Sequence, residues 1–503
     1  MTRRRLLVAA LIFGSFAAFA SYRAPIPGVN EPQYLCKAKH FWNRDWCAQD
    51  FFLSSADAHY VFYFTIGALT RFFSLEQTAW IGRILLWASL AISWARLAGR
   101  LLGQPLAPLW SACIFLALQA SGNLSGEWLI GGVEAKGFAY AALLLAIEAA
   151  SSGSVRRASA ASGAAVSFHP VVGLWGALAL AAAWWANRRT TQGGGTGRWQ
   201  SAVASGLLWI AFALPGLIPA LILLADRPSP EISHQADRIQ VFDRLKHHLD
   251  PQQFPRRGDI AYGALLGCWL LGRRLIQHSE AELLFTRFVL ATLVIAAAGL
   301  VIGLGPRWPG FMKFYPFRLF DVFLPIAVAM TAVGLFEQIA DAASAGRFPR
   351  TAARWLAPAA GCTALVWAIA APGRIANAAN WKRPGNWESF VEACLWIQRN
   401  TPRDALFLTP RYNVGFKWYA QRAELVSQKD CPQDAAGIVE WKERVKGVER
   451  WRSKHIESGF STAALVDLES RTGVDYILGS NEDPWQVEPI YRNKRFSVYS
   501  VPK

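Results

Sequence analysis

Residues 29–59, VNEPQYLCKAKHFWNRDWCAQDFFLSSADAH, follow the first apolar segment of the chain. This stretch contains four carboxylates (Glu31, Asp45, Asp50 and Asp57), two histidines and three tryptophan or tyrosine rings. Acidic residues at the mouth of a membrane protein are costly unless they hold a cation, a proton or a substrate. The stretch therefore predicts a functional loop, and the alternative is a charged loop that is only solvated.

The composition of the chain is that of an integral membrane protein. Its 503 residues are 53% hydrophobic and only 17% charged, which is too apolar for an ordinary soluble protein of this length. The 23 tryptophans and the net charge of +17 fit interfacial anchors and basic cytoplasmic loops. Because no basic run is interleaved with aromatics in a soluble segment, we expect the lipid bilayer and not nucleic acid as a partner.

The hydropathy pattern predicts eleven transmembrane spans. They lie near residues 6–22, 78–96, 105–121, 137–153, 157–171, 172–187, 201–225, 259–275, 282–304, 317–338 and 355–373. The apolar segment at 60–73 is shorter than the roughly 20 residues that a spanning helix needs, so we expect it to lie at the external surface. With that assumption the basic clusters share the side of the N-terminal arginines, which predicts a cytoplasmic N-terminus. These clusters are Arg96/Arg100, Arg156/Arg157, Arg188/Arg189, Arg273/Arg274 and Arg347/Arg350/Arg354.

The chain divides into two predicted domains, a transmembrane domain at 1–377 and an external α/β domain at 378–503. The expected external loops of the first are residues 23–77, 122–136, 226–258 and 305–316. In the second, helices are predicted at 387–399, 435–451 and 462–472, and strands at 405–410, 476–478 and 496–501. Alternation of strands and helices indicates a small α/β fold. The absence of a nucleotide-binding glycine loop from this sequence argues against a soluble nucleotide-sugar donor.

A family resemblance starts in the first external loop. Asn30-Glu31-Pro32-Gln33-Tyr34, followed by Arg44-Asp45-Trp46, resembles the first external loop of GT-C-type membrane glycosyltransferases, such as protein mannosyltransferases and aminoarabinose transferases. Those enzymes place an Asp-Glu pair after the first transmembrane helix, whereas this chain has Asn30 where the Asp usually stands. The resemblance implies a polyprenyl-phosphate-linked sugar donor, an unidentified acceptor and transfer at the periplasmic face of the inner membrane.

The resemblance also suggests roles for residues of that loop. Glu31, Asp50 and Asp45 are the expected catalytic carboxylates, and His59 is expected to support them. Glu31 and Asp50 would also hold a divalent cation, Mg²⁺ or Mn²⁺, if the enzyme uses one. Carboxylates of this kind either activate the acceptor as a general base or position a metal against the donor phosphate.

Three later loops supply candidate substrate-binding residues. Glu134 and Lys136 either form a structural ion pair, or Lys136 contacts a substrate phosphate. Residues 226–259 have helical spacing with a basic face, which predicts an amphipathic helix on the membrane surface. The resemblance suggests that His234 and Arg238 of this segment cover the donor lipid. Lys313 and Arg318 lie in an aromatic-rich loop, where they either bind a lipid phosphate or only anchor the interface.

Two alternatives to a glycosyltransferase remain open from the sequence. Pro215 and Pro219 interrupt the seventh span, and broken helices are a feature of transporters and lipid flippases. A non-catalytic assembly protein would instead use the external domain to hold partners. A last expectation concerns Cys36 and Cys47, which share one external loop and are predicted to form a disulfide there.

Overall fold

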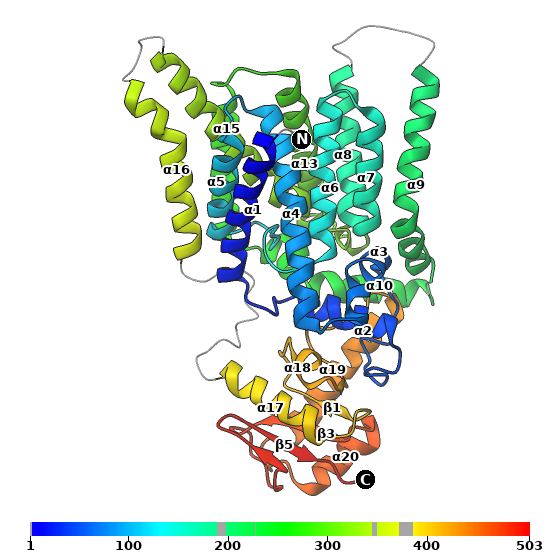
Figure 1. Cartoon of the computed structure of the whole chain (residues 1–503). Helices are drawn as coiled ribbons and strands as arrows, with labels where there is room; N and C mark the ends of the chain where they lie inside the picture. The colour runs from blue at the N-terminus through cyan, green and yellow to red at the C-terminus, as the bar shows by residue number, and fades with distance from the viewer. Residues whose placement is uncertain (1–2, 189–197, 227, 345–349, 372–385) are drawn as a thin grey trace.

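The computed structural model describes residues 3–188, 198–226, 228–344, 350–371 and 386–503. A helical bundle forms one part of the molecule and a smaller α/β part, at the C-terminal end of the chain, forms the other (Figure 1). The N-terminus lies at the end of the bundle farthest from the α/β part, and the C-terminus lies within the α/β part (Figure 1). The basic residues Arg189 and Arg347, and the expected domain boundary near residue 377, lie outside the described ranges.

Each of the eleven predicted spans corresponds to one helix of the bundle. The helices are α1 (Arg3–Arg23), α4 (Leu75–Leu101), α5 (Ala107–Ser121), α6 (Ala135–Ser151), α7 (Val155–Phe168), α8 (Pro170–Arg188), α9 (Arg198–Ala225), α12 (Arg256–Arg273), α13 (Glu280–Leu304), α15 (Arg318–Ser344) and α16 (Arg350–Ala370). Within the described ranges, seven helices are long and apolar enough to cross a membrane. The fold class expected from the sequence is therefore confirmed for the helical part.

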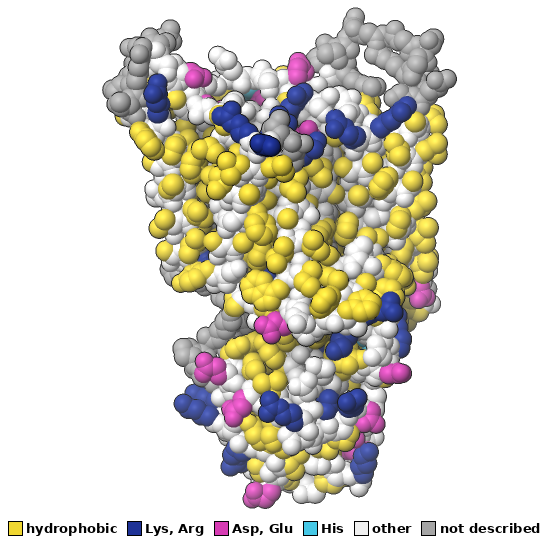
Figure 2. Space-filling model, viewed as in Figure 1, with side chains coloured by type: hydrophobic (Ala, Val, Ile, Leu, Met, Phe, Trp, Pro, Cys, Tyr) yellow, Lys and Arg dark blue, Asp and Glu magenta, His cyan; other side chains and the backbone are white. Residues whose placement is uncertain are grey.

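The helices pack around a buried aromatic core. Trp94 of α4 contacts Phe16 of α1 edge to face and Phe115 of α5 at a centroid distance of 5.0 Å. The Trp94 indole N–H donates to the Ser111 hydroxyl at 3.0 Å, so its polar atom is satisfied inside the core. On the outside, hydrophobic side chains cover the visible face of the bundle as a broad band, with basic side chains along its upper rim (Figure 2). A contiguous apolar surface of this size is typical of lipid contact.

Short helices join the bundle to the α/β part. They are η1 (Pro32–Cys36), α2 (Lys37–Trp42), α3 (Tyr60–Phe64), η2 (Gly67–Arg71), α10 (Pro230–Arg238), η3 (Ile239–Arg244), α11 (Lys246–Leu249), η4 (Pro251–Gln253) and α14 (Pro309–Met312). Because α3 and η2 have five residues each, the segment at 60–73 forms no span, as predicted. Helix α4 then begins with a capping box, in which Ser74 accepts from the Gln77 N–H and Gln77 accepts from the Ser74 N–H.

The α/β part contains a five-stranded sheet of order β2-β1-β3-β5-β4. Its strands are β1 (Leu406–Leu408), β2 (Ala423–Glu424), β3 (Tyr476–Ser480), β4 (Tyr491–Arg492) and β5 (Phe496–Ser500). Strands β2, β1 and β3 are parallel, whereas β5 runs antiparallel to β3 and β4. The helices are α17 (Asn386–Asn400), α18 (Phe416–Ala420), α19 (Ala435–His455) and α20 (Thr462–Thr472). The sequence predicted this α/β character but not the short elements α18, β2 and β4.

The predicted bridge between Cys36 and Cys47 is wrong. Both residues are free thiols and both are buried in the hydrophobic cluster that also contains Leu35 and Leu53. A free cysteine behaves as a small hydrophobic residue, so packing accounts for both positions without a covalent link.

Candidate functional site

Five charged residues meet at the end of the bundle that faces the α/β part. We call Glu127, Glu134, Lys136, Arg318 and Lys429 the charge cluster. The Lys136 Nζ atom lies 3.3 Å from Glu127 Oε1 and 3.4 Å from Glu134 Oε2. The Arg318 Nε atom lies 3.1 Å from Glu127 Oε2. Glu127 and Glu134 are each 4% exposed and Lys136 is 8% exposed, so the ion pairs are shielded from water.

Lys429 enters the cluster from the α/β part, in the loop that follows β2. Its ammonium donates to Asn30 Oδ1 at 2.5 Å, and the Asn30 amide donates to Glu134 Oε1 at 3.0 Å. Burial, assisted by the nearby Arg244, lowers the pKa of Lys429 to about 8. Asn30 therefore connects the two parts of the molecule, at the position where the resembled family has its Asp.

Asp321 holds the loop that presents Glu127. It lies in the first turn of α15, one turn after Arg318, and its carboxylate accepts from the backbone N–H groups of Leu124 (2.7 Å), Ser125 (2.8 Å) and Glu127 (3.0 Å). A buried carboxylate that accepts several N–H bonds is strongly oriented. Because Asp321 and Arg318 share one helix, the same turn fixes both partners of the Glu127–Arg318 pair.

Arg318 is surrounded by rings. Its guanidinium lies 3.8 Å from the Tyr315 ring centroid, and its Nη1 lies 3.4 Å from His169 Nε2. The His59 ring is 5.4 Å from that of His169. Burial, followed by the charge of Arg318, lowers the pKa of His59 to about 4, so this imidazole is neutral at pH 7. Its buried Nδ1 is among the side-chain atoms of the described residues that have no hydrogen-bond partner.

Glu31 lies outside the charge cluster and is fully buried. Its carboxylate accepts two bonds from Arg83, from Nε at 2.6 Å and from Nη2 at 2.7 Å. It also accepts the backbone N–H groups of Gly28 at 2.6 Å and Val133 at 2.8 Å. Every oxygen of Glu31 is thus occupied, and the residue joins the loop after α1 to α4 and to the loop before α6.

Asp50 links the loop after α1 to the α/β part. It accepts the N–H groups of Leu53 at 2.8 Å and Glu424 at 2.9 Å, and lies 3.4 Å from Lys417 Nζ. Burial raises the pKa of Asp50 to about 6, against the opposing effect of Lys417. Asp45, by contrast, is exposed at the surface of the same loop.

The proposed metal ligands do not fit a divalent cation. Glu31 and Asp50 already have a cationic partner and backbone N–H donors on their oxygens, which leaves no open pair of lone pairs for a metal. In the part of the chain that the structure describes, no group of three or more His, Cys, Asp or Glu side chains is arranged to hold a metal ion.

The predicted surface segment at 226–259 is broken into α10, η3, α11 and η4, and α10 lies between the bundle and the α/β part (Figure 1). His234 and Arg238 are exposed on α10 and do not join the charge cluster. Lys313 pairs with Asp237 of α10 at 2.7 Å and so fastens this segment to α14. Of the predicted site residues, Glu134, Lys136, Arg318 and His59 lie near one another, whereas the expected catalytic carboxylates Glu31, Asp45 and Asp50 lie elsewhere.

Glu127 and Lys429 are the site residues that sequence reasoning missed. Glu127 lies between Gly126 and Trp128, in the loop that leads to Glu134 and Lys136. A carboxylate in an otherwise apolar stretch near these two charges is the signal that could have identified it. Lys429 lies in a segment of ordinary globular composition, where one lysine among many gives no signal.

Comparisons with known proteins give two findings. Residues 388–448 match a family model described as a domain of unknown function (DUF6798). The structure is similar to the crystal structure of ArnT from Cupriavidus metallidurans bound to undecaprenyl phosphate, with 12% sequence identity and a TM-score of 0.48 over 98% of this chain and 97% of that chain. No curated protein sequence matches the chain.

Proposed function

We propose that this protein is an integral membrane glycosyltransferase that moves a sugar from a polyprenyl-phosphate-linked donor to an acceptor. The observation that supports it is the surplus of buried positive charge in the charge cluster. Three cations (Lys136, Arg318 and Lys429) face two carboxylates (Glu127 and Glu134), a difference of +1. A surplus of this kind at the end of a membrane bundle suits a lipid phosphate, which Arg and Lys bind through charge-assisted hydrogen bonds.

The donor phosphate would be held by the same three cations. Arg318 presents a planar guanidinium, which matches two phosphate oxygens, and Lys136 and Lys429 act as point charges. Lys136 and Arg318 pair with Glu127 and Glu134 in the structure, so the phosphate would take over contacts that these two carboxylates make. Of the two alternatives open from the sequence for Lys136, the structure has the ion pair, and our proposal is that the pair opens to the phosphate.

Glu134 is the residue that we assign as general base. Burial raises the pKa of Glu134, which moves a carboxylate toward the range useful for accepting a proton. The acceptor hydroxyl gives its proton to Glu134 while its oxygen forms a bond to the anomeric carbon of the sugar. The bond from that carbon to the phosphate oxygen breaks, and the polyprenyl phosphate leaves with the electron pair. The cations stabilise the charge that develops on the leaving phosphate, and no step needs a metal ion.

The orientation of the protein in the membrane belongs to this proposal. Arg100 lies in the last turn of α4, where it donates to the Ser151 carbonyl at the end of α6, and Arg156 lies in the first turn of α7. These helix ends lie at the end of the bundle that is farthest from the α/β part (Figure 1). The positive-inside rule then places the N-terminus in the cytoplasm and the domain at 378–503 in the periplasm, beside an inner membrane. The charge cluster faces that domain, so transfer takes place at the external face.

Transport gains no support from the broken helix. Pro215 and Pro219 are inside α9, but most residues of this helix are not buried, and the helix lies at the edge of the bundle (Figure 1). Substrate sites of transporters lie between repeats inside the bundle, whereas Pro215 is exposed and Pro219 is half-buried on this outer helix.

Glycolipid transfer by membranes that contain the full chain tests the proposal. The substrates are polyprenyl-phosphate-linked hexose and aminosugar donors, and the variant is Glu134→Gln. Loss of the base should lower the rate by roughly 10²–10⁴-fold. The control is Glu148→Gln, because Glu148 pairs with Arg96 at 2.9 Å at the opposite end of the bundle. The proposal would be contradicted if the wild-type protein consumed none of the donors, or if Glu134→Gln transferred sugar at the wild-type rate.

A further inference from the structure

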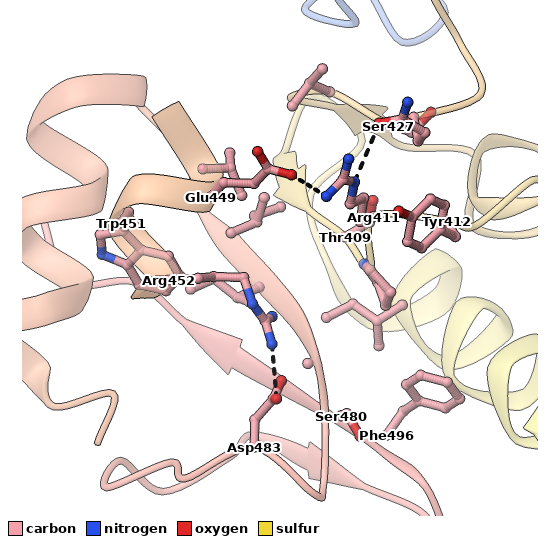
Figure 3. A pocket seen from close by; sticks show the side chains of 18 of the residues that line it. Thr409, Arg411, Tyr412, Ser427, Glu449, Trp451, Arg452, Ser480, Asp483 and Phe496 are labelled. Carbon is pink, nitrogen blue, oxygen red and sulfur yellow. Dashed lines mark hydrogen bonds and ion pairs between the residues drawn. The ribbon is translucent and has the colours of Figure 1, made fainter. Parts of the chain in front are cut away.

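A cavity of about 750 Å³ lies in the α/β part, and none of the five charge-cluster residues lines it. Its volume is in the range of small-molecule binding sites, which is roughly 300–1,000 Å³. The walls come from the loops after three strands and from α19 (Figure 3). The proposed transfer reaction makes no use of this cavity.

The sheet topology places the cavity where ligands bind in other open α/β sheets. From β1 the chain passes to β2 on one side, and the next parallel strand, β3, lies on the other side of β1. The loops after these strands begin at Thr409, Leu425 and Asn481, at the carboxyl ends of the strands, and each contributes to the cavity wall. Such a reversal of strand order leaves a crevice outside the carboxyl ends of the strands, which is the general ligand position in this architecture.

The charges that line the cavity are balanced. Arg411 pairs with Glu449 of α19, and Arg452 of α19 reaches Asp483 beyond β3 at 2.9 Å (Figure 3). A third pair joins Arg495 to Glu482 at 2.8 Å. Three cations and three carboxylates leave no surplus charge to select a phosphate or another anion.

The remaining lining suits a ligand with many hydroxyl groups. Ser427, Gln428 and Ser480 add neutral groups that both donate and accept hydrogen bonds. Tyr412 is 57% exposed, and the Arg411 guanidinium lies 5.0 Å from its ring centroid. A sugar hydroxyl can donate to a carboxylate and accept from a guanidinium at once, and an exposed ring can cover the apolar face of a sugar.

From these observations we propose that this cavity binds a neutral oligosaccharide. The carboxylate and guanidinium of each pair contact neighbouring hydroxyl groups, and Tyr412 packs against a ring face. Because the ligand and the contacts are separate from the charge cluster, this proposal does not depend on the transfer reaction.

Saturation-transfer NMR on the purified full-length protein tests it directly. The probes are maltotriose and chitotriose as neutral trisaccharides, with inorganic pyrophosphate and trialanine as the alternative ligand classes. The variants are Arg452→Ala and Asp483→Asn, and the second keeps the shape of its side chain. The matched control is Arg471→Ala, since Arg471 forms an exposed pair with Asp467 away from the cavity.

We expect the wild-type protein to give saturation-transfer signals with at least one trisaccharide. The signal should be at least fivefold weaker in a cavity variant that keeps the wild-type unfolding temperature, and it should be unchanged in Arg471→Ala. Absence of signal from both trisaccharides overturns the proposal. Equal signal in wild type and both cavity variants also overturns it, as does binding of pyrophosphate or trialanine in place of the sugars.

Discussion

Replacing Glu31 by Gln separates a structural from a catalytic role for the residue that the family resemblance selects. In the folded protein Glu31 is 0% exposed and receives four hydrogen bonds, two of them from Arg83. A glutamine has one acceptor oxygen, and its amide group would face N–H donors on the other side. The substitution therefore leaves Arg83 buried without a countercharge.

The cost follows from those contacts. Removing one partner of a buried ion pair typically destabilises a protein by roughly 3–5 kcal/mol. Although Glu31→Gln keeps the size of the side chain, it should therefore lower the free energy of unfolding by about this amount. The double variant Glu31→Met with Arg83→Met should be less destabilised than Glu31→Met alone, because no buried charge remains without a partner.

Chemical and thermal unfolding of the detergent-purified protein measure the effect, with glycolipid transfer assayed on the fraction that remains folded. Asp45→Asn is the control, since Asp45 is exposed on the same loop. If Glu31→Gln kept the wild-type unfolding free energy and lost transfer, Glu31 would be catalytic and our structural assignment would be refuted.

Three further predictions concern other parts of the molecule. The transfer rate should fall as the pH rises through about 8, because Lys429 loses its charge above its lowered pKa. Lys429→Arg keeps the charge and should retain the rate at higher pH. An identical pH profile in both proteins would count against a role for this charge. Alkylation of the unfolded protein without reductant should label both Cys36 and Cys47. If both cysteines were protected from the reagent, they would be joined by a disulfide and our correction would be wrong. Alkaline phosphatase fused after Lys503 should be active and fused near Gln104 inactive, because its own disulfides form only outside the cytoplasm; the reverse pattern would invert the proposed orientation.

The helical part of the fold could be predicted because each long helix is a continuous run of mostly apolar residues in the sequence. A transmembrane span requires about 20 apolar residues, which residues 60–73 do not provide. The distribution of basic residues among the loops also indicates that this segment does not cross the membrane. The order of helices and longer strands in the α/β part was also predictable from periodicity. The short elements β2 and β4 were not, because two residues carry no periodic pattern and their pairing with β1 and β5 is set by tertiary contacts.

The site could be predicted only in part, for a physical reason. Glu134, Lys136 and Arg318 are charges at the ends of apolar helices, and the cost of placing them there is visible in the sequence. Whether a carboxylate is free or already paired depends on residues far away in the chain: Arg83 for Glu31, and Lys417 for Asp50. Lys429 could not be predicted for the same reason, because its contact with Asn30 joins residues that are 399 positions apart in the sequence.

Native mass spectrometry of the purified full chain with added undecaprenyl phosphate measures whether the charge cluster holds a lipid phosphate. We predict one bound lipid per chain in the wild type, with at least tenfold weaker binding in Arg318→Gln and in Lys136→Gln. Arg307→Gln should bind as the wild type does, because Arg307 is a nearby arginine that pairs with Asp250 at 3.0 Å outside the cluster. Equal lipid binding by wild type, Arg318→Gln and Lys136→Gln, or no binding by the wild type, would contradict the proposed site.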